Sequence, residues 1–154
     1  MSLITINTET NECQWAGANN PLYIVSSSQS AVSSMQSAFG NEMHELPTAT
    51  ASCQLYELKG DKMPIAIYER MDDFTNHEFK VTKGDCLYLF SDGLADQFGE
   101  PKGRKFMYKQ FKDLLITNCN MPMLQQKEIL EISINNWMNG YEQIDDITIL
   151  GLKI

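Results

Sequence analysis

The sequence has few of the residues that build zinc, thiol or nucleophilic sites. Its 154 residues include two histidines, His44 and His77, and four cysteines with no C-x-x-C pair among them. These separated residues do not have the spacing of a structural zinc site. Ser91 lacks the flanking glycines of a nucleophile elbow, and Cys86 lacks the phosphate-binding loop that a cysteine phosphatase needs. No G-x-x-x-x-G-K-S/T run is present, which excludes a P-loop ATPase or kinase.

Basic residues and long apolar runs are also scarce. Twelve Lys and Arg residues stand against 20 Asp and Glu residues, the formal net charge is −8, and no block of Lys or Arg occurs. This balance argues against nucleic acid or an anionic membrane as the partner. No stretch is apolar for long enough to cross a bilayer, and the N-terminus has no signal pattern. We interpret Cys13 and Cys86 as small buried side chains of strands and infer a reducing, cytosolic setting without membrane contact by this segment.

What the sequence does contain fits one globular domain over residues 1–154, with 43% hydrophobic and 21% charged residues. Alternating apolar residues predict strands near residues 3–7, 13–18 and 22–25, separated by polar turns, and we expect them to form a meander. Two further short strands are expected around the turn at Gly60-Asp61. Another is expected near Phe79, before the turn at residues 83–85.

Residues 26–52 differ in composition from the rest of the chain. They are rich in Ser and Ala and show little apolar periodicity. A structureless loop of this length is unusual inside a compact domain. We interpret the stretch as a variable, partly mobile insertion with one helical turn over residues 32–39, and a functional lid is the alternative.

The second half of the chain predicts two helices between two apolar strands. The segments 103–118 and 123–139 carry apolar residues at helical spacing, including Phe111, Leu115 and Trp137. The strands "CLYLF" (86–90) and "ITILGLKI" (147–154) are apolar in both alternating sets, so we expect both faces of each strand to be covered. Such strands fit an α+β layered sandwich of antiparallel sheets with helices packed outside. The segments supply one helical layer and about half of such a sandwich.

Two acidic motifs lie at the ends of these apolar strands. Asp92 follows the strand 86–90, and Asp145 precedes the strand 147–154. Each motif taken alone predicts only a turn or a helix cap. If the two strands are antiparallel neighbours, both carboxylates lie at the same edge of the sheet, where a hard cation such as Mg²⁺ or Mn²⁺ would relieve their repulsion. Because successive strand side chains point to opposite faces, only one of Asp145 and Asp146 should face the shared site.

The segments "KGDCLYLFSDGLADQFG" and "DDITILGLKI", with two helices between them, resemble the SpoIIE-like branch of the PPM-type metal-dependent Ser/Thr phosphatases, the protein phosphatase 2C superfamily. "WAGANNPLYIV" and "DKMPIAIY" resemble further segments of its C-terminal half. The resemblance implies an α-β-β-α sandwich and a dinuclear Mn²⁺ or Mg²⁺ centre that hydrolyses phosphoserine or phosphothreonine. It assigns metal ligation to Asp92 and Asp145, close backbone approach to Gly93, and supporting positions to Asp146 and Asp96.

The chain departs from the family pattern at its N-terminus. The family's other ligands lie in an N-terminal block with an Asp before a Gly-His-Gly type motif, and neither His44 nor His77 is in such a context. We therefore expect residues 1–154 to be the C-terminal fragment of a phosphatase domain that is inactive, or nearly so, as it stands.

Three hypotheses follow. The first is a fragment of a bacterial signalling phosphatase whose parent carries a sensor or receiver domain and dephosphorylates a phosphorylated regulatory protein. The second is a non-catalytic phosphatase-like module for protein–protein interaction in two-component-type signalling. The third is an acidic sandwich domain whose aspartates only form turns. A truncated sandwich should also expose an apolar edge or face, so we expect self-association.

Overall fold

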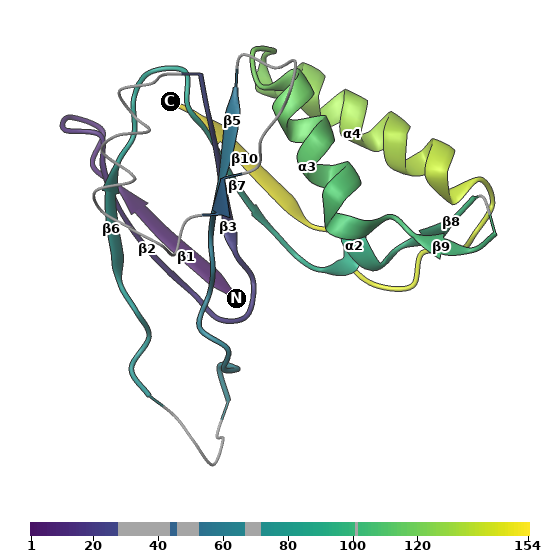
Figure 1. The fold of residues 1–154 in the computed structure, drawn as a ribbon, viewed down its shortest axis with the longest axis horizontal. Coiled ribbons are helices and arrows are strands. Elements are labelled where there is room, and N and C mark those ends of the chain that lie inside the picture. Colours follow the sequence, from purple (N-terminus) through teal and green to yellow (C-terminus); the bar gives the residue numbers. More distant parts are fainter. Residues whose placement is uncertain (28–43, 46–52, 67–71, 101) are drawn as a thin grey trace.

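The computed structural model describes residues 1–27, 44–45, 53–66, 72–100 and 102–154. A first antiparallel sheet has the strand order β1-β2-β6 (Figure 1). Its strands are β1 (Ser2–Ile6), β2 (Glu12–Gly17) and β6 (His77–Lys80). Cys13 lies opposite both Ile6 and Phe79 in the register, so apolar residues of the three strands share one face.

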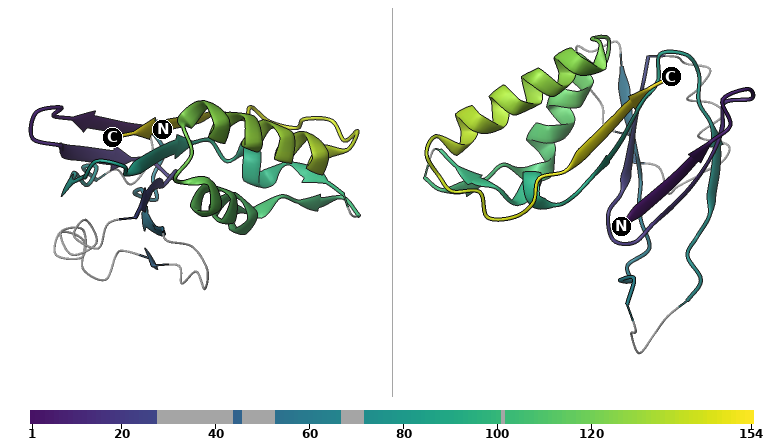
Figure 2. Two further views of the ribbon diagram at one scale, coloured as in Figure 1. Left: turned by 90° about the horizontal axis from the view of Figure 1, so that it is seen from above. Right: turned by 180° about the vertical axis from the view of Figure 1, so that it is seen from behind.

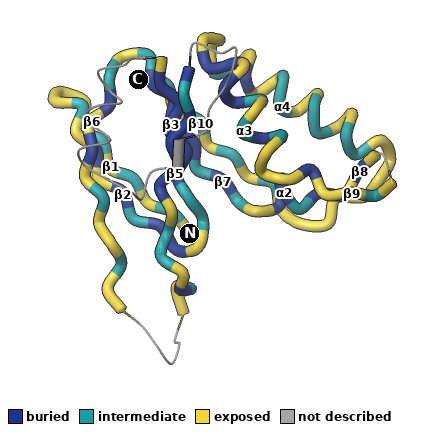
Figure 3. Tube along the Cα trace, in the orientation of Figure 1, coloured by how far each residue is buried: buried dark blue, intermediate teal, exposed yellow. Residues whose placement is uncertain are grey.

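A second antiparallel sheet has the order β10-β7-β3-β5-β4. Its strands are β3 (Leu22–Ser26), β4 (His44–Glu45), β5 (Gln54–Leu58), β7 (Cys86–Phe90) and β10 (Ile149–Lys153). The central strands β3 and β7 are buried on both faces almost throughout (Figure 3). The two sheets and the helices beside them confirm the α+β layered class predicted from the sequence.

Two apolar clusters hold the layers together. One lies between the sheets and contains Trp15, Ile24, Tyr56 and Leu87. The other lies between the second sheet and the helices, where Tyr23 and Phe90 meet Phe111 of α3. Because β3 and β7 contribute to both clusters, their positions are fixed from both sides.

The helical layer consists of α3 (Met107–Asn118) and α4 (Met123–Met138), as the apolar spacing predicts. Helix α4 ends at Asn139, whose left-handed backbone (φ 40°) precedes Gly140 (φ 93°), so the predicted stop at Asn139-Gly140 is confirmed. A short helix, α2 (Gly93–Asp96), and a small ribbon of β8 (Phe98–Gly99) and β9 (Arg104–Lys105) connect β7 to α3. Helix α2 was not predicted from the sequence as a separate element.

Two strand predictions were wrong. The third strand of the expected meander, β3, pairs with β5 and β7 in the second sheet, because the turn at Asn19-Asn20-Pro21 carries the chain from one sheet to the other. The hairpin expected at Gly60-Asp61 does not form within the described residues 61–66. The Asp61 carboxylate instead accepts hydrogen bonds from the backbone N–H (2.8 Å) and hydroxyl (2.9 Å) of Thr75, and Asp61 bridges to Ala18.

The prediction that both faces of the last strand are covered was also wrong. In β10, Leu150 is 61% and Leu152 is 44% exposed, whereas their register partners Leu89 and Leu87 pack into the cluster between the sheets. Strand β10 is the edge of its sheet, and these two leucines on it are open to solvent.

Most of the serine-rich stretch 26–52 lies outside the described residues, including the helical turn expected over 32–39. Within the stretch, Ser26 ends β3 and residues 44–45 form β4, which pairs with β5.

Cys53 and Cys119 form a disulfide that joins the start of β5 to the end of α3, whereas Cys13 and Cys86 are free and buried. A disulfide is not expected in the reducing setting inferred from the sequence. The sequence did not indicate this pairing, because 66 positions separate the two cysteines along the chain. Among the helices that the structure describes, none is long and apolar enough to cross a membrane.

Candidate metal site

Hydrogen bonds of Ser91, the residue before Asp92, join the end of β7 to the segment that leads into β10. The backbone N–H of Ser91 donates to the carbonyl of Thr148 (3.0 Å), and the Thr148 N–H donates to the Ser91 hydroxyl oxygen (3.0 Å). The same hydroxyl donates to the carbonyl of Asp146 (2.7 Å). These bonds extend the β7–β10 register past the strand ends. The predicted pairing of the two strands, which brings the backbone segments of the two acidic motifs side by side, is therefore confirmed.

Gly93 makes this close approach possible. An added Cβ at Gly93 would lie 2.5 Å from the carbonyl oxygen of Asp146 and 2.9 Å from its carbon. Contacts that short do not occur in real structures, so any larger residue at position 93 would push the backbone around Asp146 away. The glycine thus keeps the two acidic segments in contact.

The Asp92 side chain is exposed and is not used to cap the helix that follows it. Asp92 stands at the N-cap position of α2 with helical backbone angles and no side-chain capping hydrogen bond. Its backbone carbonyl accepts from the N–H of Asp96 (3.1 Å). The ordinary role of an Asp before a short helix is therefore not the one observed, and the carboxylate oxygens can bind a cation.

Asp145 and Asp146 are both exposed on the segment that enters β10. One carboxylate oxygen of Asp145 accepts from the Asp146 N–H (2.7 Å), which leaves its other oxygen open to a ligand. Which of the two side chains faces Asp92 stays a prediction.

Gln97 positions the segment that carries Asp145, a role that was not predicted from the sequence. Its side chain is fully buried (0% exposed). The amide donates to the carbonyl of Glu142 (2.9 Å), and its oxygen accepts from the backbone N–H of Ile144 (3.4 Å). The backbone carbonyl of Gln97 also accepts from the indole N–H of Trp137 (3.3 Å). A glutamine one residue after α2 thereby fixes the chain just before Asp145.

Asp96 and Tyr108 are further titratable residues close to Asp92. Asp96 forms an ion pair with Lys105 (3.0 Å), in which both side chains are close to half exposed. Tyr108, in the first turn of α3, packs its ring against Phe90 at 6.2 Å between centroids. Burial raises the pKa of Tyr108, and the negative charges of Asp92, Asp96 and Glu57 raise it further. The phenol therefore lies within the field of the candidate carboxylates.

The donor atoms of the candidate site are of the type that a hard cation prefers. Asp92 and Asp145 offer carboxylate oxygens, which Mg²⁺ and Mn²⁺ prefer, and both side chains are open to solvent. In the part of the chain that the structure describes, no group of three or more His, Cys, Asp or Glu side chains has the geometry of a metal site. The residues present can thus hold part of a coordination shell.

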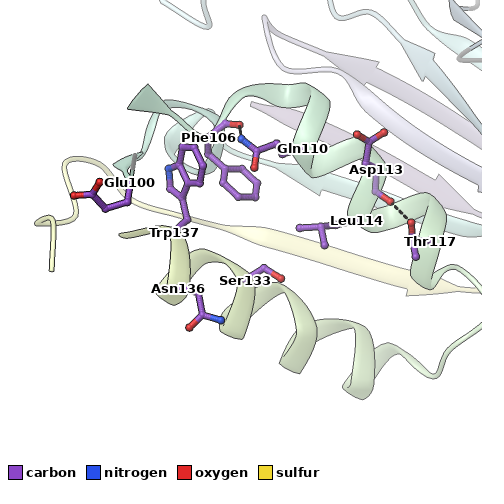
Figure 4. A pocket seen from close by; sticks show the side chains of 9 residues that line it. All are labelled: Glu100, Phe106, Gln110, Asp113, Leu114, Thr117, Ser133, Asn136 and Trp137. Carbon is purple, nitrogen blue, oxygen red and sulfur yellow. Dashed lines mark hydrogen bonds between the residues drawn. The ribbon is translucent and has the colours of Figure 1, made fainter. Parts of the chain in front are cut away.

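A separate cleft between α3 and α4 lies outside this acidic region. Figure 4 shows its lining side chains, which come from both helices and, with Glu100 and Phe106, from the chain before α3. Phe106 and Trp137 stack edge to face at its inner end, 5.6 Å between centroids. The amide of Gln110 donates to the Phe106 carbonyl (2.7 Å) and the Thr117 hydroxyl to the Asp113 carbonyl (2.7 Å). The side chains of Gln110 and Thr117 are thus bound to backbone carbonyls of α3 and of the residue before it.

The sheets, the helical layer and the acidic segments at the joined ends of β7 and β10 correspond in fold to a PP2C-type phosphatase domain. The chain is similar to the solved structure "SiaA-PP2C domain of Pseudomonas aeruginosa", with a TM-score of 0.75 and 25% sequence identity over 99% of this chain. The family model "Stage II sporulation protein E (SpoIIE)" matches residues 1–154. The chain therefore belongs to the SpoIIE family of PPM-type phosphatases, and the resemblance seen in its motifs is confirmed.

The chain covers 50% of the length of the SiaA-PP2C chain. The comparison with curated proteins gave no match.

Proposed function

We propose that residues 1–154 supply one side of a Mn²⁺- or Mg²⁺-dependent active site that hydrolyses phosphoserine or phosphothreonine on a regulatory protein. The observation that carries this proposal is the pair of hydrogen bonds between Ser91 and Thr148, which hold the segments of Asp92 and Asp145 together. Membership of the SpoIIE family supports the reaction class. A bacterial, cytoplasmic signalling protein with a sensor or receiver domain is the setting we propose for the parent.

Asp92 and Asp145 are the residues that would hold the cation, with Asp146 and Asp96 as neighbouring carboxylates. When bound, Mn²⁺ or Mg²⁺ lowers the pKa of a coordinated water and neutralises charge that develops on the phosphoryl group. Gly93 and Gln97 act on the site indirectly, because they set the backbone positions on either side of Asp145.

We also propose that this chain alone has little or no phosphatase activity. Two aspartates hold Mg²⁺ or Mn²⁺ weakly, and a dinuclear centre of the kind implied by the resemblance needs further carboxylates. The chain spans half of the SiaA-PP2C domain, which leaves room for such ligands in a second half.

Manganese binding tests the metal proposal directly. We expect the chain to bind Mn²⁺ weakly and Asp92→Asn to lower the affinity at least tenfold, as measured by EPR of free Mn²⁺ during a titration. Asp113→Asn removes another exposed carboxylate, on α3, and serves as the matched control, with no expected change. Equal affinity in the wild-type chain and Asp92→Asn would contradict a metal-binding role and favour the non-catalytic module.

A further inference from the structure

One short stretch of this acidic chain is basic. Residues 102–109 hold four of the 12 Lys and Arg residues and no Asp or Glu. The four are Lys102, Arg104, Lys105 and Lys109, and all of them are exposed. Arg104 and Lys105 form β9, and Lys109 lies in the first turn of α3. We call residues 102–109 the basic segment.

The basic segment lies next to the candidate metal ligands. Lys105 pairs with Asp96 (3.0 Å), and the N–H of Asp96 donates to the carbonyl of Asp92 (3.1 Å). Burial, and then the charges of Asp92 and Asp96, raise the pKa of Tyr108, which belongs to the basic segment. In both views of Figure 2 the ribbon of β8 and β9 lies at the end of the molecule that carries α2, opposite the first sheet. A protein bound with one residue at Asp92 would therefore bring its neighbouring residues close to these cations.

The ribbon that carries β9 is anchored to the rest of the fold. Its two strands pair, with Phe98 opposite Lys105. The N–H of Glu100 donates to the carbonyl of Trp137 at the end of α4 (2.9 Å). The N–H of Phe106 donates to the carbonyl of the buried Gln97 (2.9 Å). The exposed basic side chains thus project from a backbone that is held on both sides.

Most of these cations have no anionic partner. Within the described part of the chain, Lys102, Arg104 and Lys109 form no ion pair. Lys105 is paired with Asp96, but both side chains are close to half exposed, and exposed ion pairs are weak. The basic segment can therefore attract an anionic ligand without first breaking a strong internal pair.

Apolar side chains lie among the cations. Met107 is 57% and Tyr108 is 37% exposed, and Phe98, the register partner of Lys105, is 36% exposed. Aromatic residues, Met and Arg are enriched where proteins bind proteins. An inorganic anion makes no use of the apolar groups, whereas a polypeptide with acidic and apolar side chains can contact both kinds.

We propose that the basic segment is a docking surface for an acidic stretch of the phosphorylated regulatory protein, which it binds beside the phosphorylated residue. The proposal rests on the proposed function, which supplies the phosphoprotein. Charge complementarity of this kind selects partners and speeds their encounter.

Nucleic acid fits the same surface less well, although exposed cations and aromatic side chains also bind single strands. The Asp96 carboxylate pairs with Lys105, and the Glu100 carboxylate accepts from the Lys102 N–H (3.2 Å), so two negative charges border the basic segment. A strand with one negative charge per nucleotide cannot avoid them. A polypeptide carries its charges at single positions and can leave uncharged residues beside those carboxylates.

Fluorescence anisotropy with the 154-residue chain tests the proposal in metal-free buffer. The probe is a fluorescein-labelled peptide with a central serine and three glutamates on each side, and its control has glutamine in place of each glutamate. We expect the basic-segment variant Lys102→Gln/Arg104→Gln/Lys109→Gln to bind the glutamate peptide about tenfold more weakly. The wild-type chain should bind the glutamine peptide more weakly by a similar factor.

A matched variant removes the same net charge outside the basic segment. Lys62→Gln/Lys80→Gln/Lys83→Gln, at three other exposed positions, should weaken binding of the glutamate peptide by less than about twofold. In the wild-type chain the peptide should shift the NMR amide signals of residues 98–109 and leave those of residues 80–83 unchanged.

Equal affinity of the wild-type chain and the basic-segment variant would overturn the proposal. An equal loss in the matched variant would also overturn it, because binding would then follow net charge alone. Tighter binding of an oligothymidylate, lost in the basic-segment variant, would overturn it in favour of nucleic acid. Asp92→Asn should bind the peptide at least as tightly as the wild-type chain, because it removes a nearby negative charge. Loss of Mn²⁺ binding and loss of docking are therefore separable results.

Discussion

The structural role of Asp92 depends on the residues around it. An Asp before a short helix ordinarily caps the first turn, but here the Asp92 side chain makes no capping bond. The backbone is instead held by the bonds of Ser91 to the segment before β10. The free carboxylate therefore acts on its surroundings through its charge, and Tyr108 is the group that reports this charge.

The pKa of Tyr108 should fall when Asp92 is neutralised. Burial is the larger cause of the raised pKa, and the charges of Asp92, Asp96 and Glu57 add to it. Asp92→Asn should therefore lower the pKa of Tyr108 without restoring the ordinary value, whereas Asp113→Asn should leave it unchanged. Titration of the ¹³C-labelled tyrosine ring by NMR, assigned with Tyr108→Phe, measures this shift. An unchanged pKa in Asp92→Asn would mean that the phenol does not lie beside that carboxylate.

The raised pKa of Tyr108 determines how its contribution to the stability of the fold changes with pH. A phenol whose folded-state pKa lies above its unfolded value binds its proton more tightly in the folded state. Tyr108 therefore contributes stability that is present below the ordinary tyrosine pKa and is lost as the pH rises through the folded-state value.

At the scale of elements, the sequence patterns correctly predicted the features that depend on residues close together along the chain. The apolar spacing of α3 and α4 and the stop at Asn139-Gly140 depend on neighbours within a few residues, and the structure confirms them. The sheet assignment of β3 and the exposure of β10 depend on which other strands are present, which an apolar run does not encode. Gln97 was missed for a related reason, because a glutamine is ordinarily an exposed residue.

Helix α4 is attached to β7 by a buried pair of polar side chains. The Tyr88 hydroxyl donates to the Gln126 amide oxygen (2.5 Å), and the Gln126 amide donates to the Met121 carbonyl (2.9 Å). Gln126→Leu should lower the free energy of unfolding by about 1–3 kcal/mol, because the Tyr88 hydroxyl is left buried without its acceptor. The exposed Gln125→Leu should change it by less than about 0.5 kcal/mol.

Denaturant unfolding of the single variants and of Tyr88→Phe/Gln126→Leu would measure the coupling between the two side chains. We expect the double variant to lose less than the sum of the single variants, because the unpaired hydroxyl is then absent. Strictly additive losses would show that the hydrogen bond does not join α4 to the sheet.

At the scale of the whole molecule, the fold is a layered sandwich that is complete in its interior and open on one side. The motifs predicted the family and the α+β sandwich class, and the family model and the similarity to the SiaA-PP2C domain confirm both. The exposed apolar edge was expected in general terms from the small number of predicted segments. Its location at β10 could not be predicted, because the two strands next to the acidic motifs, 86–90 and 147–154, are equally apolar in sequence.

The disulfide between Cys53 and Cys119 crosses this architecture from the second sheet to the helical layer. It closes a loop with a sequence separation of 66 residues. On chain entropy alone, a loop of this size stabilises the fold by about 4 kcal/mol. Reductant should therefore lower the denaturant midpoint of the oxidised wild-type chain but not that of Cys53→Ala/Cys119→Ala, which has no disulfide to lose.

Thiol counting provides the independent measurement. Alkylation of the unfolded, unreduced chain should label two cysteines, Cys13 and Cys86, and reduction should raise the number to four. Four labelled thiols without reduction, together with a midpoint insensitive to reductant, would show that the pair remains reduced. In that case β5 and α3 would be held together by packing and by the ion pair between Lys112 and Glu57 (2.7 Å), without a covalent bond. A loss of stability on reduction would instead mean that the helical layer, and with it the position of Tyr108 beside Asp92, depends on the redox state around the protein.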